Sequence, residues 1–162
     1  MSGAFDQPDE RLADLDPTAR ALLPVLRHVL VTLERPESQA WRLAFSSAAR
    51  GWGEARGLAL AYRAQSFVVM LSADRPQPLS YNDPLDPIDR DGLTTDELLI
   101  LGLLTAFSRD DELAARAFLA RLVSFGPAKE ATLRAARDLA DALDPMGPAP
   151  VSQHRPALRL VS

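Results

Sequence analysis

Apolar residues recur along the chain at the three-to-four-residue spacing of helices, and proline or glycine separates most of the periodic segments. The pattern marks six candidate helices and no strand. We expect these helices to begin near residues 17, 36, 54, 95, 111 and 127. Most connections between them are short, which favours antiparallel packing of helices that follow one another. The sequence therefore predicts an all-α fold, a compact bundle of five to six helices.

Two helix starts carry specific signals. Asp16 followed by Pro17 has the arrangement of an N-cap residue and a proline in the first helical turn. Thr94 and Glu97 have the spacing of a capping box, in which the side chain of each residue binds the backbone N–H of the other. The run 98–107 that follows is apolar nearly all round, so we expect it to form the most buried helix.

The same spacing predicts which side chains point into the core. In the helix expected over 54–72, the predicted inward residues are Leu58, Ala61, Tyr62, Val68 and Val69. We also assign Leu33 of the first helix and Phe125 of the fifth helix to the core.

A break in the pattern over 73–93 separates the third helix from the fourth. Prolines at 76, 78, 84 and 87 preclude a long regular element in this segment. A connection of this length is either functional or a linker. We predict one helical domain over 15–144, with helices over 15–72 and 94–144, an acidic proline-rich loop between them, a flexible segment over 1–14 and a disordered tail over 145–162.

The composition excludes several kinds of catalytic site. The chain has no cysteine, which removes disulfides, thiolate nucleophiles and cysteine-bound metal clusters. Its two histidines, His28 and His154, leave little for a histidine-based triad or metal site. No glycine-rich phosphate loop and no nucleophile elbow is present. We therefore predict no enzymatic activity and no cofactor.

The spacing of Asp89, Asp91 and Gly92 resembles part of a calcium-binding loop. In that alignment Pro87 occupies the first ligand position, and Leu98 occupies the twelfth, where a bidentate glutamate is required. The pattern lacks two of its main ligands. We therefore predict no metal site here.

The charge distribution indicates where a partner would bind. The net charge is −4, and residues 74–112 hold ten acidic residues against three arginines. An acidic segment between mildly basic ones favours internal ion pairs or a charged partner surface. The candidate partner-binding residues are four acids of the loop and two arginines of the third helix: Asp83, Asp86, Asp89, Asp91, Arg56 and Arg63.

Two other functions stay open. Arginines recur every six to eight residues from Arg20 to Arg63, and such a series could contact phosphates in a nucleic-acid-binding regulator. We favour a polar helix edge instead, with some members meeting the acidic loop, because aromatic residues for base stacking are few. The second alternative is a small-molecule sensor with a pocket among the aromatic residues Trp41, Trp52, Tyr62 and Phe67.

Residues 101–127 resemble a single tetratricopeptide helical hairpin. Gly102 and Phe118 fall near positions where the two helices of such a repeat pack, whereas Leu98 and Thr105 stand where the family has aromatic residues. A tetratricopeptide solenoid needs about three repeats, and we find one in this sequence. The resemblance implies a packed helical pair and assigns no family to the chain.

We therefore expect a non-enzymatic interaction or regulatory protein that binds another protein through helix surfaces and the acidic loop. The acidic N-terminus lacks the apolar stretch of a signal peptide, and the apolar run 98–107 is about half the length of a membrane span. We expect a soluble, cytoplasmic protein that binds neither membrane nor nucleic acid. If the first or third helix leaves an apolar face uncovered, a homodimer would cover it.

Overall fold

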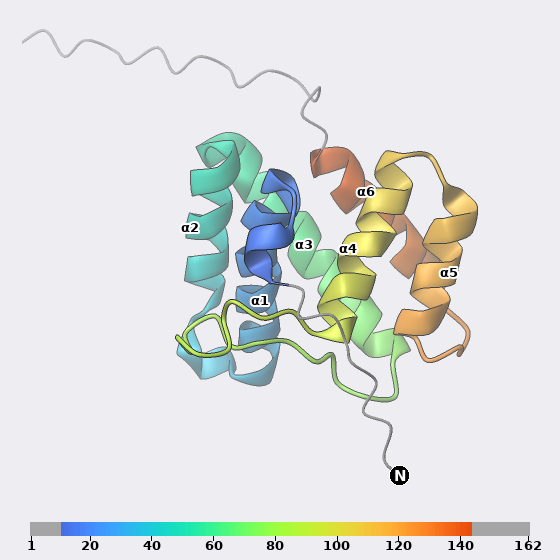
Figure 1. Ribbon diagram of the computed structural model, residues 1–162, viewed down its shortest axis with the longest axis horizontal. Helices are drawn as coiled ribbons and strands as arrows, with labels where there is room; N and C mark the ends of the chain where they lie inside the picture. The colour runs from blue at the N-terminus through green and yellow to red at the C-terminus, as the bar shows by residue number, and fades with distance from the viewer. Residues whose placement is uncertain (1–10, 144–162) are drawn as a thin grey trace, which may run out of the picture.

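The computed structural model describes residues 11–143 and has an all-α fold (Figure 1). The six helices are α1 Pro17–Glu34, α2 Trp41–Trp52, α3 Glu54–Asp74, α4 Thr95–Ser108, α5 Glu112–Leu122 and α6 Glu130–Leu143. Short 3-10 turns cover Leu12–Asp14 and Pro36–Ser38, and residues 11–143 contain no β-strand. The predicted fold class is confirmed. The predictions for residues 1–10 and for the tail over 145–162 concern residues outside the described range.

The helices form two groups that share one core (Figure 1). Helices α1, α2 and α3 pack on one another in the first group, and α4 packs on α5 and α6 in the second. Helix α3 joins the two groups, because it also packs along α6. The largest fully buried side chains come from both groups and include Phe67 of α3, Ile100 of α4 and Leu139 of α6. The core is therefore continuous across the bundle.

Polar side chains fix the helix starts at the predicted positions. The Asp16 carboxylate accepts hydrogen bonds from the N–H groups of Thr18 and Ala19 at 2.9 and 3.0 Å. Thr94 and Glu97 form the predicted capping box. Eight of the 14 residues of α4 are buried, a larger share than in any other helix. The prediction that this helix is the most buried is confirmed.

Glycine allows helices to approach closely at two places. A Cβ atom on Gly57 of α3 would lie 2.6 Å from backbone atoms of Ala48 in α2, so a larger residue does not fit between these helices. A Cβ atom on Gly102 of α4 would lie 2.6 Å from the ring of Phe118 in α5. Helices α4 and α5 thus pack as a hairpin in which an aromatic ring lies directly on a glycine.

The inward face predicted for α3 is wrong at three of its five positions, whereas Ala61 and Val68 are buried as predicted. Leu58, Tyr62 and Val69 are exposed, and the buried positions lie on a neighbouring face of the helix. That buried face consists of Gly57, Leu60, Ala61, Ala64, Phe67, Val68 and Leu71. Three of these residues are glycine or alanine, which let α2 come close but add little to a hydrophobic pattern. The pattern therefore favoured a face with Leu58, Tyr62 and Val69, which in fact point to water.

Two further core assignments are wrong. Leu33 lies in the last turn of α1 and is exposed. Phe125 lies beyond the end of α5, because the helix stops at Leu122 and the next residues turn with positive φ angles at Ser124 and Phe125. The helical spacing that placed its ring inside does not extend this far, and the ring is exposed.

Candidate functional site

The candidate site is the connection between α3 and α4, residues 75–94, which we call the acidic loop. In Figure 1 it leaves the lower end of α3, crosses α1 toward α2 and returns to the start of α4. It contains turns and bends but no helix or strand. Such a segment needs contacts from other elements to hold one shape.

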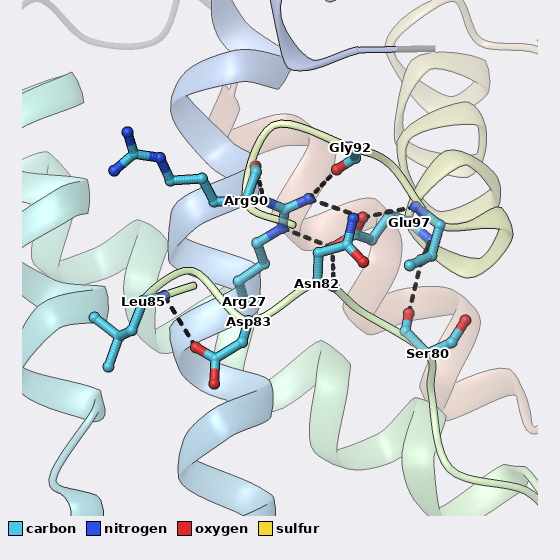
Figure 2. Close-up of polar contacts among 9 residues, drawn as sticks. Arg27, Ser80, Asn82, Asp83, Leu85, Arg90, Gly92 and Glu97 are labelled. Carbon is cyan, nitrogen blue, oxygen red and sulfur yellow. Dashed lines mark hydrogen bonds and ion pairs between the residues drawn. The ribbon is translucent and has the colours of Figure 1, made fainter. Parts of the chain in front are cut away.

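Arg27 of α1 anchors the acidic loop from beneath (Figure 2). Its side chain is 3% exposed, and its guanidinium donates to the carboxylate of Glu97 with Nε–Oε1 at 2.7 Å and Nη2–Oε2 at 3.0 Å. The same guanidinium donates to the backbone carbonyl oxygens of Arg90 and Gly92, the latter at 2.6 Å. Because a guanidinium stays charged and holds its donors in one plane, this single side chain fixes the loop and α4 together.

Glu97 completes this buried anchor from the first turn of α4. Its carboxylate is 2% exposed and, besides Arg27, accepts from the N–H groups of Asn82 at 3.3 Å and Thr94 at 2.9 Å. Both buried charges are therefore paired and hydrogen-bonded. Removing one partner of such a pair leaves the other charge uncompensated, which typically costs about 3–5 kcal/mol.

A second ion pair holds the first part of the acidic loop. Arg75 and Asp96 form two parallel hydrogen bonds, each 3.1 Å long. Asp96 also accepts from the backbone N–H and the hydroxyl of Ser80, at 2.8 and 3.0 Å. Arg75 donates in addition to the carbonyl oxygen of Leu122, at the end of α5. The start of the loop is thus tied to both α4 and α5.

The outer part of the loop pairs with the end of α1. Asp83 lies 2.9 Å from the Arg35 guanidinium, and the Tyr81 hydroxyl donates to Glu34 at 2.6 Å. The N–H of Leu85 and the charge of Arg35 lower the pKa of Asp83. Burial and the hydrogen bond to Glu34 raise the pKa of Tyr81 to about 12. At neutral pH both side chains therefore keep the protonation state that these contacts require.

His28 of α1 lies near this outer part and is 8% exposed. Its Nδ1 atom is buried and has no hydrogen-bond partner in the described part of the chain. Burial lowers the pKa of His28, the negative charge of Asp83 opposes that shift, and the positive charge of Arg50 adds to it. The imidazole is therefore neutral at pH 7.

The tip of the acidic loop, residues 83–91, is shaped by its own aspartates. Asp83 accepts from the N–H of Leu85 at 2.9 Å, and Asp86 accepts from the N–H of Ile88 at 2.8 Å. These are local turns of the kind that aspartate favours. The side chains of Leu85 and Ile88 are 65% and 86% exposed, and Figure 2 shows Leu85 directed away from Arg27. Two large apolar side chains thus project from an acidic surface.

The predicted partner-binding residues lie in two places. Asp83, Asp86, Asp89 and Asp91 all lie on the tip of the acidic loop. Arg56 and Arg63 lie on α3. There Arg56 donates to the carbonyl oxygen of an α6 residue, Ala142, at 3.1 Å, and Arg63 lines a groove between α3 and α6. The structure does not join the acids and the arginines in one site.

The residue sets behind the two alternative functions are also dispersed. In the arginine series, Arg27 is buried under the acidic loop, whereas Arg35 is paired at the surface with an acid of the tip. Among the aromatic residues, Phe67 is fully buried in the core, and Trp41 and Tyr62 are exposed on different helices. Neither set is gathered around one surface or pocket.

The residues that shape the loop were not predicted from the sequence. One signal for Arg27 exists, because it stands within the apolar stripe of α1, where a charge needs a buried partner. Nothing in the sequence shows that this partner is Glu97, which lies 70 positions further along the chain. For Leu85 and Ile88 no sequence signal distinguishes an exposed apolar side chain from one that folds back onto the bundle.

Within residues 11–143 no group of three or more histidine, aspartate or glutamate residues is placed to hold a metal ion. The same range contains no helix of the length and apolar character that crossing a membrane requires. Comparison of the chain with known protein families, curated proteins and solved structures yields no match.

Proposed function

We propose that this chain is a non-enzymatic interaction or regulatory protein that binds another protein through the tip of the acidic loop. The observation that carries the proposal is the exposure of Leu85 and Ile88 on a segment whose base is fixed by the buried pair of Arg27 and Glu97. Exposed apolar side chains contribute little to the folded monomer and are common in binding surfaces. A loop already held in one shape loses little entropy on binding, so its contacts count more fully toward affinity.

The chemistry of the tip describes the partner that it fits. Asp89 and Asp91 are exposed beside the two apolar side chains, and Ile88 projects furthest into water. Buried apolar anchors carry most of the affinity of an interface, while charges at its rim steer association and select the partner. We therefore expect a protein surface with an apolar pocket for Ile88 and lysine or arginine residues around it.

A tip variant tests this proposal. Leu85→Arg combined with Ile88→Arg replaces the apolar anchors and adds charge that opposes a basic partner. For a partner captured with the wild-type chain and then purified, we expect the dissociation constant to rise at least about tenfold, which is the scale of an interface hot spot. The matched control is Leu113→Arg on α5, because Leu113 is equally apolar and is also exposed.

The control variant should bind like the wild-type chain, and circular dichroism should show all three proteins equally folded. Calorimetry with the purified partner gives the dissociation constants. A partner that binds the tip variant as tightly as the wild-type chain contradicts the proposal. A partner that loses affinity only for the α5 variant contradicts it as well and assigns binding to another face.

A second candidate function is self-association through α3. Leu58, Tyr62 and Val69 share one exposed face of this helix, and Met70 lies next to it. A two-fold dimer would cover such an apolar face. We expect light scattering to show a dimer at high concentration that Tyr62→Glu dissociates. A strict monomer throughout the concentration series contradicts this candidate.

A further inference from the structure

A hollow of about 520 Å³ lies between the start of α1, the second half of α4 and the end of α6, and we call it the α1/α4/α6 pocket. Leu22, Leu104 and Phe107 line its apolar part. The volume lies within the range of pockets that bind small molecules. The first turns of α1 line the pocket, whereas the acidic loop contacts α1 at Arg27 and near its end. The two sites are therefore separate.

The rim of this pocket is acidic. Asp16, Asp110 and Asp141 line it, against a single basic residue, Arg109. None of the three carboxylates has an ion-pair partner within residues 11–143. Helices α4 and α6 both end at the pocket, and the negative ends of their dipoles outnumber the one positive end of α1, which begins there. The pocket therefore favours an occupant that combines apolar side chains with a positive charge.

We propose that the α1/α4/α6 pocket binds a segment of the same chain, Leu158-Arg159-Leu160. The two leucines cover the apolar part of the pocket, and the guanidinium of Arg159 lies among the carboxylates of the rim. Residues 145–162 contain two arginines and no acidic residue, so their charge is opposite to that of the rim. Within them, 157–161 is an apolar run interrupted only by Arg159.

Because α6 ends at the pocket, few residues separate the pocket from the segment that we propose binds there. Leu143, the last residue of α6, itself lines the pocket, and Leu158 follows 15 positions later. A chain of that length reaches about 50 Å when fully extended. Tethering gives the segment an effective concentration of the order of millimolar. A modest intrinsic affinity is therefore enough to fill the pocket.

The consequence is competition at this pocket. A basic, leucine-containing peptide from another protein has to displace the chain's own segment before it binds. The contact then acts as an internal inhibitor of that site. It does not depend on the proposed role of the acidic loop, which lies elsewhere on the molecule.

Disulfide trapping in the full chain tests this proposal, because the natural sequence has no cysteine. Thr105→Cys on the exposed edge of the pocket is combined with Ala157→Cys, next to the docked segment. The matched control combines Thr105→Cys with Ser152→Cys. If the segment does not dock, the control disulfide forms at least as fast as the Ala157→Cys disulfide, because the loop that it closes is shorter. If the segment docks, we expect the opposite order, in which the disulfide of the Ala157→Cys pair forms about tenfold faster than that of the control.

A charge exchange in the same trapping experiment tests the assigned ion pairs. Asp141 is exposed on α6, so Asp141→Arg leaves the buried core unchanged, and Arg159→Asp is the complementary change. Each single change should slow closure to the rate of the control, and the two changes together should restore it. If the disulfide forms at the same rate with and without these changes, the proposal is contradicted. Disulfides between molecules, at a rate that grows with protein concentration, contradict it too and assign the pocket to a second copy.

Discussion

The helical core and the acidic loop differ in what holds them in place. The core is built from apolar side chains of both helix groups, such as the fully buried Phe67 and Leu103. The acidic loop buries one large apolar side chain, Leu79, and is otherwise held by hydrogen bonds and ion pairs, such as those of Arg27 and Arg75. Apolar burial is non-directional, whereas a guanidinium fixes the position of each acceptor that it binds.

This difference separates the stability of the bundle from the presentation of the loop tip. A change in the core lowers the free energy of unfolding and leaves the local contacts of the loop in place. A change at Arg27 or Glu97 affects both the stability of the bundle and the position of the loop tip, because this buried pair joins α1, α4 and the loop. A change at the tip should alter binding alone. Four substitutions test this difference, and they follow in order of their expected effect on stability, from the largest to the smallest.

The largest loss of stability is expected from Arg27→Met. The variant leaves the Glu97 carboxylate buried without its charged partner, so the free energy of unfolding should fall by about 3–5 kcal/mol. Urea denaturation measures the change. The matched control is Arg35→Met, which removes the solvent-exposed pair with Asp83 and should cost far less. Equal losses for the two variants would show that the buried anchor has no special role.

In the core, Gly57→Ala should lower the free energy of unfolding by about 1–3 kcal/mol, because overpacking moves helices apart. The added Cβ atom would lie 2.6 Å from the backbone of Ala48, which has no flexible side chain to move away. Gly51→Ala is the control, since its Cβ atom meets the Cβ of Ala21 at an ordinary 3.6 Å. Thermal unfolding of both variants gives the comparison, and an unchanged melting temperature for Gly57→Ala contradicts the close approach.

A smaller effect is expected from pH. Burial lowers the pKa of His28 below its ordinary value of 6.5 in spite of the nearby Asp83. Below pH 6.5 the unfolded chain therefore binds a proton more readily than the folded chain does, and stability falls as the pH drops. The lowered pKa of Asp83 acts only at lower pH, below 3.8. Urea denaturation between pH 7 and 5 should show a smaller decline for His28→Gln than for the wild-type chain. A decline of equal size in both is the contrary result.

The smallest effect on stability is expected at the tip. Ile88→Ser changes a side chain that is 86% exposed, so the free energy of unfolding should stay within about 0.5 kcal/mol of the wild-type value. Urea denaturation checks this directly. A loss well above 1 kcal/mol would mean that Ile88 supports the fold, and its exposure would then be no argument for a binding role.

The elements of the fold could be predicted from the sequence because their signals are local. The capping residues Asp16 and Thr94 lie within three positions of the groups that they bind. The apolar run of α4 likewise carries its own evidence of burial. The buried face of α3 was harder to predict, because close packing at Gly57 depends on the backbone of α2 and leaves no hydrophobic signal in the sequence. Where packing is set by shape rather than apolar area, the periodicity of the sequence misleads.

The acidic loop could be located from its prolines and aspartates, but its shape could not be predicted. The decisive contacts join residues far apart in the sequence, such as Arg27 with Gly92 and Arg75 with Leu122. A regular spacing of arginines gave no means of telling the buried Arg27 from the exposed Arg35. Which arginine meets which acid follows from the packing of α1 against the start of α4.

Hydrogen exchange in the double variant Arg27→Met/Glu97→Leu tests whether the buried pair holds the acidic loop in place. An apolar pair avoids the unpaired buried charge of the single variant, so the helices should stay folded. We predict that the backbone amides of Asn82, Arg90 and Gly92, each hydrogen-bonded in the wild-type chain, exchange at least about tenfold faster, while those of the α3 core keep their protection. Loop amides as protected as in the wild-type chain, in a folded double variant, would contradict the claim that the buried charges hold the loop.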